Sequence, residues 1–300
     1  MNELRTDYED EPDDREYRLV VAVGNPEYAE QLVRTAADVA RANDGEIHVV
    51  SVVQKPRESP FALFSDETIK AEFAGDRREI LDRALETAPD TVPVHGRVAV
   101  GTDVADALIS AVKELEADAL LVGWHGRPRR SEVVLGTTID VVLRRAPCDV
   151  LVERIGLTAN GVERVLLPVA GGPHLPLAAS VADAVAASND ATIDVLSVVA
   201  PTAGEDERET ARGHLEEAVA LLTAGTETEL REAPAVDDAI IEAANGCDLV
   251  VFGVTRRGVV RRRLVGSIPQ TVGRRTDRTV ILARRRPDPS VIGRLTGRLW

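Results

Sequence analysis

The chain has very little lysine. Only three of its 36 basic residues are Lys, and the other 33 are Arg. Aromatic residues are also scarce, at 3% of 300 residues, whereas 50 acidic residues give a net charge of −14. An acidic, lysine-poor chain is typical of proteins from salt-loving organisms, because carboxylates keep a protein surface hydrated at high salt. The overall charge and the lack of aromatic residues among the basic ones also argue against a nucleic-acid partner.

Long apolar runs are absent as well. No stretch approaches the roughly 20 apolar residues that a membrane span requires. The first 17 residues, "MNELRTDYEDEPDDREY", are acidic and lack the apolar core of a signal peptide. We therefore expect residues 1–17 to form a disordered acidic N-terminus, and the protein to be cytoplasmic.

Residues that commonly carry catalysis or bind metals are few and scattered. The two cysteines, Cys148 and Cys247, lie beside strand-like runs with no CxxC spacing, which favours buried, reduced thiols. The five histidines show no ligand spacing, so no metal site is expected. The chain also lacks a GxSxG elbow, a Walker A lysine and an HExxH motif. We therefore predict no catalytic residues, and at most weak hydrolysis of ATP.

An internal repeat organises the chain. Residues 17–53 align without a gap to residues 163–199, and "DALLVG" at 118–123 matches "DLVVFG" at 248–253. The offset between matching positions falls from 146 to 130 along the repeat, so the second copy has a shorter middle. We predict a first domain at 18–154 (unit 1), a linker at 155–162, a second domain at 163–284 (unit 2) and a basic C-terminal tail at 285–300.

Apolar β-branched runs alternate with helical periodicity inside each repeat. In unit 1 the runs predict strands at 18–24, 46–53, 93–100, 119–123 and 149–153, and helices at 27–43, 66–88, 103–117 and 136–146. Strands that are apolar on nearly every residue belong to a parallel sheet covered on both faces. The fold class is therefore α/β, with two tandem doubly wound sandwiches that each hold a five-stranded parallel sheet.

A glycine-rich loop follows the fourth predicted strand of unit 1. Gly123, Gly126 and Gly136-Thr137 form the pattern G-x2-G-x9-G-[ST], after a buried strand and before a helix. Glycines let backbone N–H groups approach a ligand closely, and a helix start attracts phosphate. The alternative is an ordinary surface loop followed by a Thr helix cap.

This pattern and its surroundings resemble the universal stress proteins. The chain is similar to two UspA-type domains in tandem, over about 18–154 and 163–284. Its acidic, lysine-poor composition indicates a halophilic archaeon as the expected host. The resemblance implies a Rossmann-like fold related to the adenine nucleotide alpha hydrolases, and ATP as the bound cofactor, with Mg²⁺ as a possible companion. By position it implies six nucleotide contacts: Gly123, His125, Gly126, Gly136, Thr137 and Thr138.

The chain departs from the family pattern in both units. ATP-binding members usually carry Asp at the end of the first strand, where this chain has Gly24 in unit 1 and Ala170 in unit 2. Unit 2 also has Arg256 where unit 1 has Gly126, so its counterpart is a weaker second site. That second site comprises Gly253, Arg256, Gly266 and Ser267.

The C-terminal end is strongly basic, with thirteen Arg and two Asp between Val254 and Trp300. Two Arg groups stand out: 256, 257, 261, 262 and 263 in the second loop, and 284, 285 and 286 after the last strand. Three interpretations remain open: a solvated basic face, an anion site and a partner surface. The tail also carries four apolar residues, Ile292, Leu295, Leu299 and Trp300. Three docking surfaces for them remain open: the body of the protein, a membrane surface and a partner protein.

The functional prediction is a regulatory stress-response protein that binds adenine nucleotide. The alternatives are a nucleotide-independent module for protein interaction or transporter regulation, and a weak adenine-nucleotide hydrolase. Self-association, or pairing of the two domains through their last strands, is expected, and a membrane transporter or another acidic protein is a candidate partner.

Overall fold

The fold was analysed in a computed structural model of the chain. The structure describes residues 17–55, 58, 63–124, 136–156, 161–254 and 267–286. Within this part of the chain, no helix has the length and apolar character needed to cross a membrane. Residues 1–16 of the predicted acidic N-terminus, and the tail beyond Arg286, lie outside the described residues. Tyr17, predicted as part of the disordered N-terminus, is half-buried, and its carbonyl accepts a hydrogen bond from the Glu46 N–H at 3.0 Å.

Unit 1 alternates strands and helices along the chain. Its strands are β1 (Arg18–Ala22), β2 (Glu46–Gln54), β3 (Val94–Gly101), β4 (Ala119–Gly123) and β5 (Asp149–Arg154). Its helices are α1 (Pro26–Ala42), α2 (Asp66–Glu72), α3 (Gly75–Glu86), α4 (Val104–Glu114) and α5 (Thr137–Arg145). Local chemistry fixes the helix starts: Pro26 opens α1, and the Asn25 side chain accepts a hydrogen bond from the Glu27 N–H.

Unit 2 repeats this order with one helix fewer. Its strands are β6 (Arg164–Pro168), β7 (Thr192–Val199), β8 (Thr226–Glu232), β9 (Leu249–Gly253) and β10 (Thr279–Arg284). Its helices are α6 (Leu175–Asn189), α7 (Glu205–Val219), α8 (Val236–Ala244) and α9 (Ser267–Arg275).

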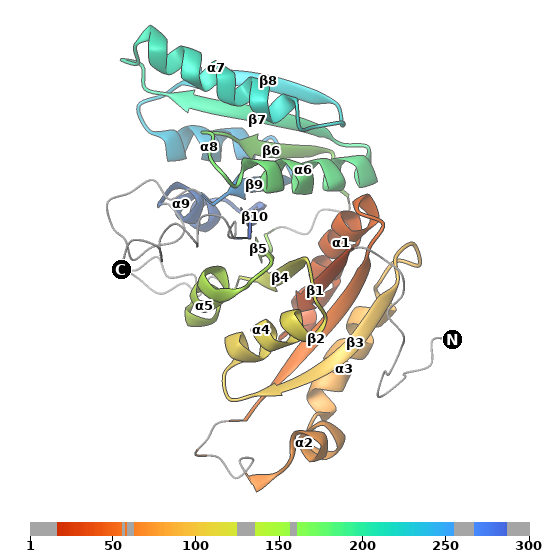
Figure 1. The fold of residues 1–300 in the computed structure, drawn as a ribbon. Coiled ribbons are helices and arrows are strands. Elements are labelled where there is room, and N and C mark those ends of the chain that lie inside the picture. The colour runs from red at the N-terminus through yellow and green to blue at the C-terminus, as the bar shows by residue number, and fades with distance from the viewer. Residues whose placement is uncertain are drawn as a thin grey trace, which may run out of the picture.

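All ten strands form one continuous sheet in the order β3-β2-β1-β4-β5-β10-β9-β6-β7-β8 (Figure 1). Every pair inside a unit is parallel, which confirms the predicted five-stranded parallel sheets. The units join through the antiparallel pair β5–β10, which confirms pairing through the last strands.

Two apolar layers cover the sheet. One layer buries side chains of α1, α3, α6 and α7, and the other buries side chains of α4, α5, α8 and α9. Each layer runs across both units without interruption, so the seam between the units is part of the hydrophobic core. Burial of apolar surface on this scale is the main force that holds such a fold together.

The single helix predicted at 66–88 is wrong. The structure has two helices here, separated by Phe73 and the buried Ala74. Gly75, a poor helix former, opens α3. The Arg78 guanidinium then donates to the Lys70 carbonyl, at 2.9 Å, near the end of α2. The break turns the chain, so that α2 packs against the edge strand β3 instead of continuing over β2.

Candidate functional site

The predicted nucleotide site falls at the carboxyl edge of the unit 1 sheet. Strand β1 ends next to Gly24 and strand β4 ends at Gly123, and the two strands are neighbours in the sheet. The order of strands reverses between β1 and β4, because α1 leads outward to β2 whereas α4 returns the chain to the other side of β1. Ligands of doubly wound folds bind at such switch points.

Gly136 precedes α5 at this edge. Its backbone φ of +102° lies in the region that favours glycine, and no side chain caps the helix start. Thr137 and Thr138 form the first residues of α5, with Thr137 exposed. The first N–H groups of a helix have no partner within the helix, and together with the positive end of the helix dipole they make this position suited to a phosphate.

The described residues leave space beside Gly24 and Gly136. A methyl group built on either glycine would meet no atom of the described part of the chain within 4 Å. His125 and Gly126, which complete the predicted loop, lie outside the described residues. The structure therefore brings the ends of β1, β4 and the start of α5 to one edge of the sheet.

Arg77 is a candidate site residue that the sequence analysis missed. Its guanidinium Nη1 donates to the Gly24 carbonyl oxygen at 3.2 Å, so a cation lies beside the position where the resemblance to the family implies Asp. Arg77 is half-buried and comes from the first turn of α3, 53 residues away in sequence. Only the packing of α3 over the sheet reveals this neighbour, because no local motif marks it.

Trp124 connects the same loop to unit 2. It follows Gly123 directly, is 6% exposed, and its backbone N–H donates to the Glu153 carbonyl at 2.7 Å. Its indole ring packs on Gly273 of α9, where an added methyl group would lie 2.6 Å from Trp124 Cζ3. The start of the candidate loop is thus anchored on the other unit.

At the equivalent edge of unit 2, the loop before α6 packs on the end of β9. Gly171 and Gly172, with φ of +66° and +108°, form a loop that delays the start of α6 to Leu175. This loop brings His174 so close to Gly253 that a methyl group on Gly253 would lie 3.1 Å from the His174 carbonyl carbon and oxygen.

The second predicted site lies only partly within the described residues. Gly253 ends β9 and Ser267 begins α9, as expected from the repeat, whereas Arg256 and Gly266 lie outside the described residues.

A buried carboxylate lies at the seam beside the site. Glu153 is fully buried on β5, and neither of its side-chain oxygens has a hydrogen-bond partner among the described residues. Burial raises the pKa of Glu153 to about 8, and the nearby charge of Asp38 adds to the effect. Glu153 is therefore mostly protonated at pH 7.

Arg284 corrects one interpretation of the basic C-terminal end. Its place in the sequence beside Arg285 and Arg286 predicts a solvated face, an anion site or a partner surface. The structure instead buries Arg284, and its guanidinium donates to three carbonyls at the end of α5, those of Leu143, Ala146 and Cys148, each at 2.9 Å. The guanidinium therefore supplies hydrogen-bond donors inside the fold, to carbonyls at a helix end that have no partner within the helix.

The cysteines are free and buried, which confirms the prediction for Cys148 and Cys247. Burial raises the pKa of both thiols to about 12, so neither forms the reactive thiolate at neutral pH. Among the described residues, no group of three or more His, Cys, Asp or Glu is placed to hold a metal ion.

Comparisons with known proteins agree with this architecture. The model of the universal stress protein family matches residues 17–154 and 161–284. A universal stress protein of Staphylococcus haemolyticus is 25% identical over 142 residues, covering 45% of this chain and 83% of the relative. The Na⁺/H⁺ antiporter NhaS5 of Synechocystis is 27% identical over 156 residues, covering 51% of this chain and 21% of the antiporter.

Solved structures share the fold over nearly the whole chain. A universal stress protein from Pseudomonas aeruginosa covers 95% of this chain and 97% of its own, with 18% identity and a TM-score of 0.61. The cytoplasmic domain of a prokaryotic cation chloride cotransporter covers 89% of this chain and 95% of its own, with 14% identity and a TM-score of 0.57.

Proposed function

The chain belongs to the universal stress protein family, and we propose that it is a regulatory member that binds one ATP in unit 1. The observation that carries the proposal is the contrast between the two sheet edges. Among the described residues, a side chain added at Gly24 or Gly136 of unit 1 would meet no atom within 4 Å, whereas in unit 2 the His174 backbone packs against Gly253, the counterpart of Gly123.

The phosphates are assigned to the loop and helix start of unit 1. Backbone N–H groups of the loop and of the first turn of α5 donate to phosphate oxygens, and the threonine hydroxyls add hydrogen bonds. The proposed contacts are Gly123, His125, Gly126, Gly136, Thr137 and Thr138. Mg²⁺ would accompany the phosphates and offset part of their negative charge.

Arg77 takes a role at this site that the usual Asp cannot fill. Its guanidinium lies at the Gly24 carbonyl, at the edge of the open space. An arginine offers several N–H donors and a permanent positive charge, which suits phosphate oxygens better than a nucleoside hydroxyl. We assign it to the phosphate chain.

Unit 2 is proposed to bind nucleotide weakly or not at all. A ligand at Gly253, Arg256, Gly266 and Ser267 would have to displace the loop that carries His174. That loop is held in place, because the His174 ring nitrogen Nδ1 accepts a hydrogen bond from the Arg285 N–H at 3.1 Å. Displacing it would cost this bond and the close packing on Gly253.

Equilibrium binding of ATP to the full chain in molar KCl tests the assignment. Gly126→Val should abolish binding, because a branched side chain would occupy the backbone cradle. The matched change in unit 2, Arg256→Val, should leave ATP affinity unchanged. Unchanged affinity in the Gly126→Val protein would refute the site. Because no catalytic base is identified, we expect at most slow hydrolysis in the same samples.

A nucleotide-independent interaction module is the second candidate function. It is favoured by the absence of a carboxylate at both Gly24 and Ala170. The similarity to NhaS5 suggests a membrane transporter as the regulated partner. This candidate predicts that ATP leaves the thermal unfolding midpoint unchanged, whereas a ligand that binds only the folded state raises it.

A further inference from the structure

Unit 1 carries an insert that unit 2 lacks. Between β2 and α3 the chain has 20 residues, 55–74, whereas five residues, 200–204, connect β7 to α7 in unit 2. The insert contains α2, which packs against β3 at one end of the ten-stranded sheet. At the other end of the sheet, β8 has no counterpart of α2 among the described residues; α7 packs against it, and it carries several charged side chains.

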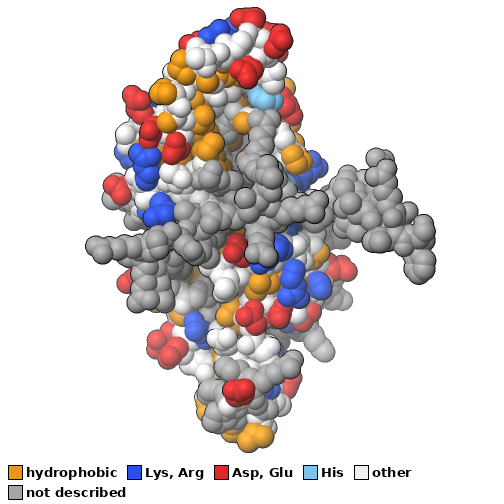
Figure 2. Space-filling view, turned by 90° about the vertical axis from the view of Figure 1, so that its left-hand side faces the viewer, with side chains coloured by type: hydrophobic (Ala, Val, Ile, Leu, Met, Phe, Trp, Pro, Cys, Tyr) orange, Lys and Arg blue, Asp and Glu red, His pale blue; other side chains and the backbone are white. Residues whose placement is uncertain are grey.

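The insert exposes apolar side chains at the tip of the molecule. Leu63 is 90% exposed, Phe64 is 40% exposed and Phe73 is 43% exposed, and the two Phe rings lie 5.3 Å apart. Figure 2 shows hydrophobic side chains reaching the surface at the lower end of the molecule, where Figure 1 places α2. We call Leu63, Phe64 and Phe73 the tip patch. Clustered apolar side chains at the surface commonly mark an interaction site.

The charge around the tip patch is nearly balanced. Residues 55–74 contain three basic and four acidic residues, in a chain whose net charge is −14. The opposite end, residues 200–232, contains three basic and nine acidic residues. Two copies of this protein repel each other over most of their surfaces, but two inserts can approach without that penalty.

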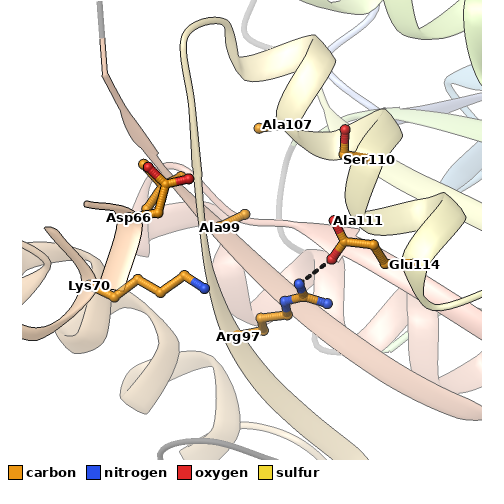
Figure 3. A pocket seen from close by; sticks show the side chains of 9 residues that line it. Asp66, Lys70, Arg97, Ala99, Ala107, Ser110, Ala111 and Glu114 are labelled. Atoms are coloured by element: carbon orange, nitrogen blue, oxygen red, sulfur yellow. Dashed lines mark hydrogen bonds and ion pairs between the residues drawn. The ribbon is translucent and has the colours of Figure 1, made fainter. Parts of the chain in front are cut away.

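Lys70 adds a cation beside the tip patch. Its ammonium makes no hydrogen bond or ion pair with another described residue, and it reaches over a cavity of about 110 Å³ between α2, β3 and α4 (Figure 3). By contrast, Arg97 in the same cavity pairs with Glu114, and Lys55 pairs with Asp66 at 3.0 Å. Lys70 is therefore available to a carboxylate from outside.

We propose that the tip patch is a self-association surface that joins two copies of this chain through their inserts. The pairing of β5 with β10 already uses the last strands inside one chain, so association of two chains needs another surface. In a two-fold contact each insert faces its own copy. The Phe64 and Phe73 rings then form the centre, and Lys70 of each copy faces the exposed carboxylates of the other insert, such as that of Glu72.

The small size of the tip patch predicts a weak dimer. Stable interfaces bury roughly 1,200–2,000 Å² of surface in total. The area that the three side chains of the tip patch and their neighbours can bury lies at or below the lower end of this range. High salt screens the repulsion between the two acidic bodies and leaves apolar contact intact. The dimer should therefore form at high protein concentration and tighten as salt is raised, opposite to an association driven by ion pairs.

Sedimentation velocity of the full chain, from micromolar to near-millimolar concentration and from low salt to molar KCl, tests the proposal. Phe64→Ser/Phe73→Ser should weaken dimer formation by about tenfold or more, because each dimer loses four apolar contacts. Leu221→Ser is the matched control, since Leu221 is an equally exposed residue (42%) in unit 2, outside the insert. Lys70→Glu should also weaken the dimer, most clearly at low salt.

A monomer at every concentration and salt would overturn the proposal. So would a dimer that is unaffected by the Phe64/Phe73 and Lys70 changes, or one that Leu221→Ser weakens as strongly. Circular dichroism confirms that each variant is folded, which is expected because all the changed side chains are at least partly exposed.

Discussion

Val152 faces Leu282 across the antiparallel junction of β5 and β10. The two residues occupy the same position in their units, since the offset between matching positions is 130 in this part of the repeat. A local two-fold axis therefore passes between them, and the two units meet as two identical subunits of a symmetric dimer would. Contacts at the seam consequently occur in pairs, with each member contributed by the opposite unit.

The paired arginines Arg154 and Arg284 give the first prediction. Arg284 donates to three carbonyls at the end of α5, and Arg154 donates to two at the end of α9, those of Thr276 and Arg278. Arg284→Met should lower the free energy of unfolding by about 2–4 kcal/mol, because it leaves buried carbonyls without donors. Arg154→Met should cost less. Urea unfolding of both variants measures this, and an equal or reversed order would contradict it.

The contact of Trp124 with Gly273 gives the second prediction. Gly273→Ala should lower the free energy of unfolding by about 1–3 kcal/mol, since the new methyl group would meet the buried indole at 2.6 Å. Gly213→Ala in α7 is the matched control. A methyl group there would meet no atom within 4 Å, so this change should stabilise the protein by up to about 1 kcal/mol. Loss of stability in both variants, or in neither, would refute the packing argument.

Much of the fold is predictable from the sequence, because buried parallel strands and amphipathic helices each leave a periodic signal. The strands of unit 1 lie within two residues of their predicted bounds, and the repeat extends this result to unit 2. The break at Phe73 and Ala74 is not predictable in this way. It depends on packing against β3, whereas the local pattern of residues 66–88 continues to read as one helix.

The candidate site was predictable only in part. The repeat and the glycine spacing placed Gly123 and Gly136 at one sheet edge, because both belong to a local motif. No local sequence pattern predicts that Arg77 lies at the site or that the His174 backbone packs against Gly253. Both arrangements arise from the way α3 and the loop before α6 pack over strand ends that are distant in sequence.

The buried carboxyl of Glu153 gives a prediction for pH dependence. Its pKa of about 8 in the folded protein lies above the ordinary 4.5. Between these values the unfolded chain releases a proton that the folded protein keeps. The free energy of unfolding should therefore fall as pH rises from about 4.5 to 8, by up to roughly 5 kcal/mol from this group. Glu153→Gln should remove this contribution, so its stability relative to the wild type should rise with pH. Urea unfolding at pH 5 and pH 8 tests this, and a difference that does not change with pH would contradict it.

Arg77 gives a prediction for nucleotide affinity. Arg77→Ala should weaken ATP binding by about tenfold, because it removes a charge-assisted hydrogen bond to the phosphate chain. Arg78→Ala is the control, since the Arg78 guanidinium donates to the Lys70 carbonyl on α2 instead of Gly24. Adenosine should bind equally well to the wild type and to Arg77→Ala. An equal loss for adenosine and ATP would place Arg77 at the nucleoside instead of the phosphates.

The stoichiometry of ATP binding to the full chain tests the central claim, that the two units of one fold have diverged into one open and one closed site. Isothermal titration calorimetry in molar KCl should give one ATP per chain. Replacing Gly126 with Val should remove that binding, and replacing Arg256 with Val should not. Two equivalent sites per chain would show that the loop at His174 does not close unit 2. No heat and no rise in unfolding temperature with ATP would show that the open edge of unit 1 is not a nucleotide site.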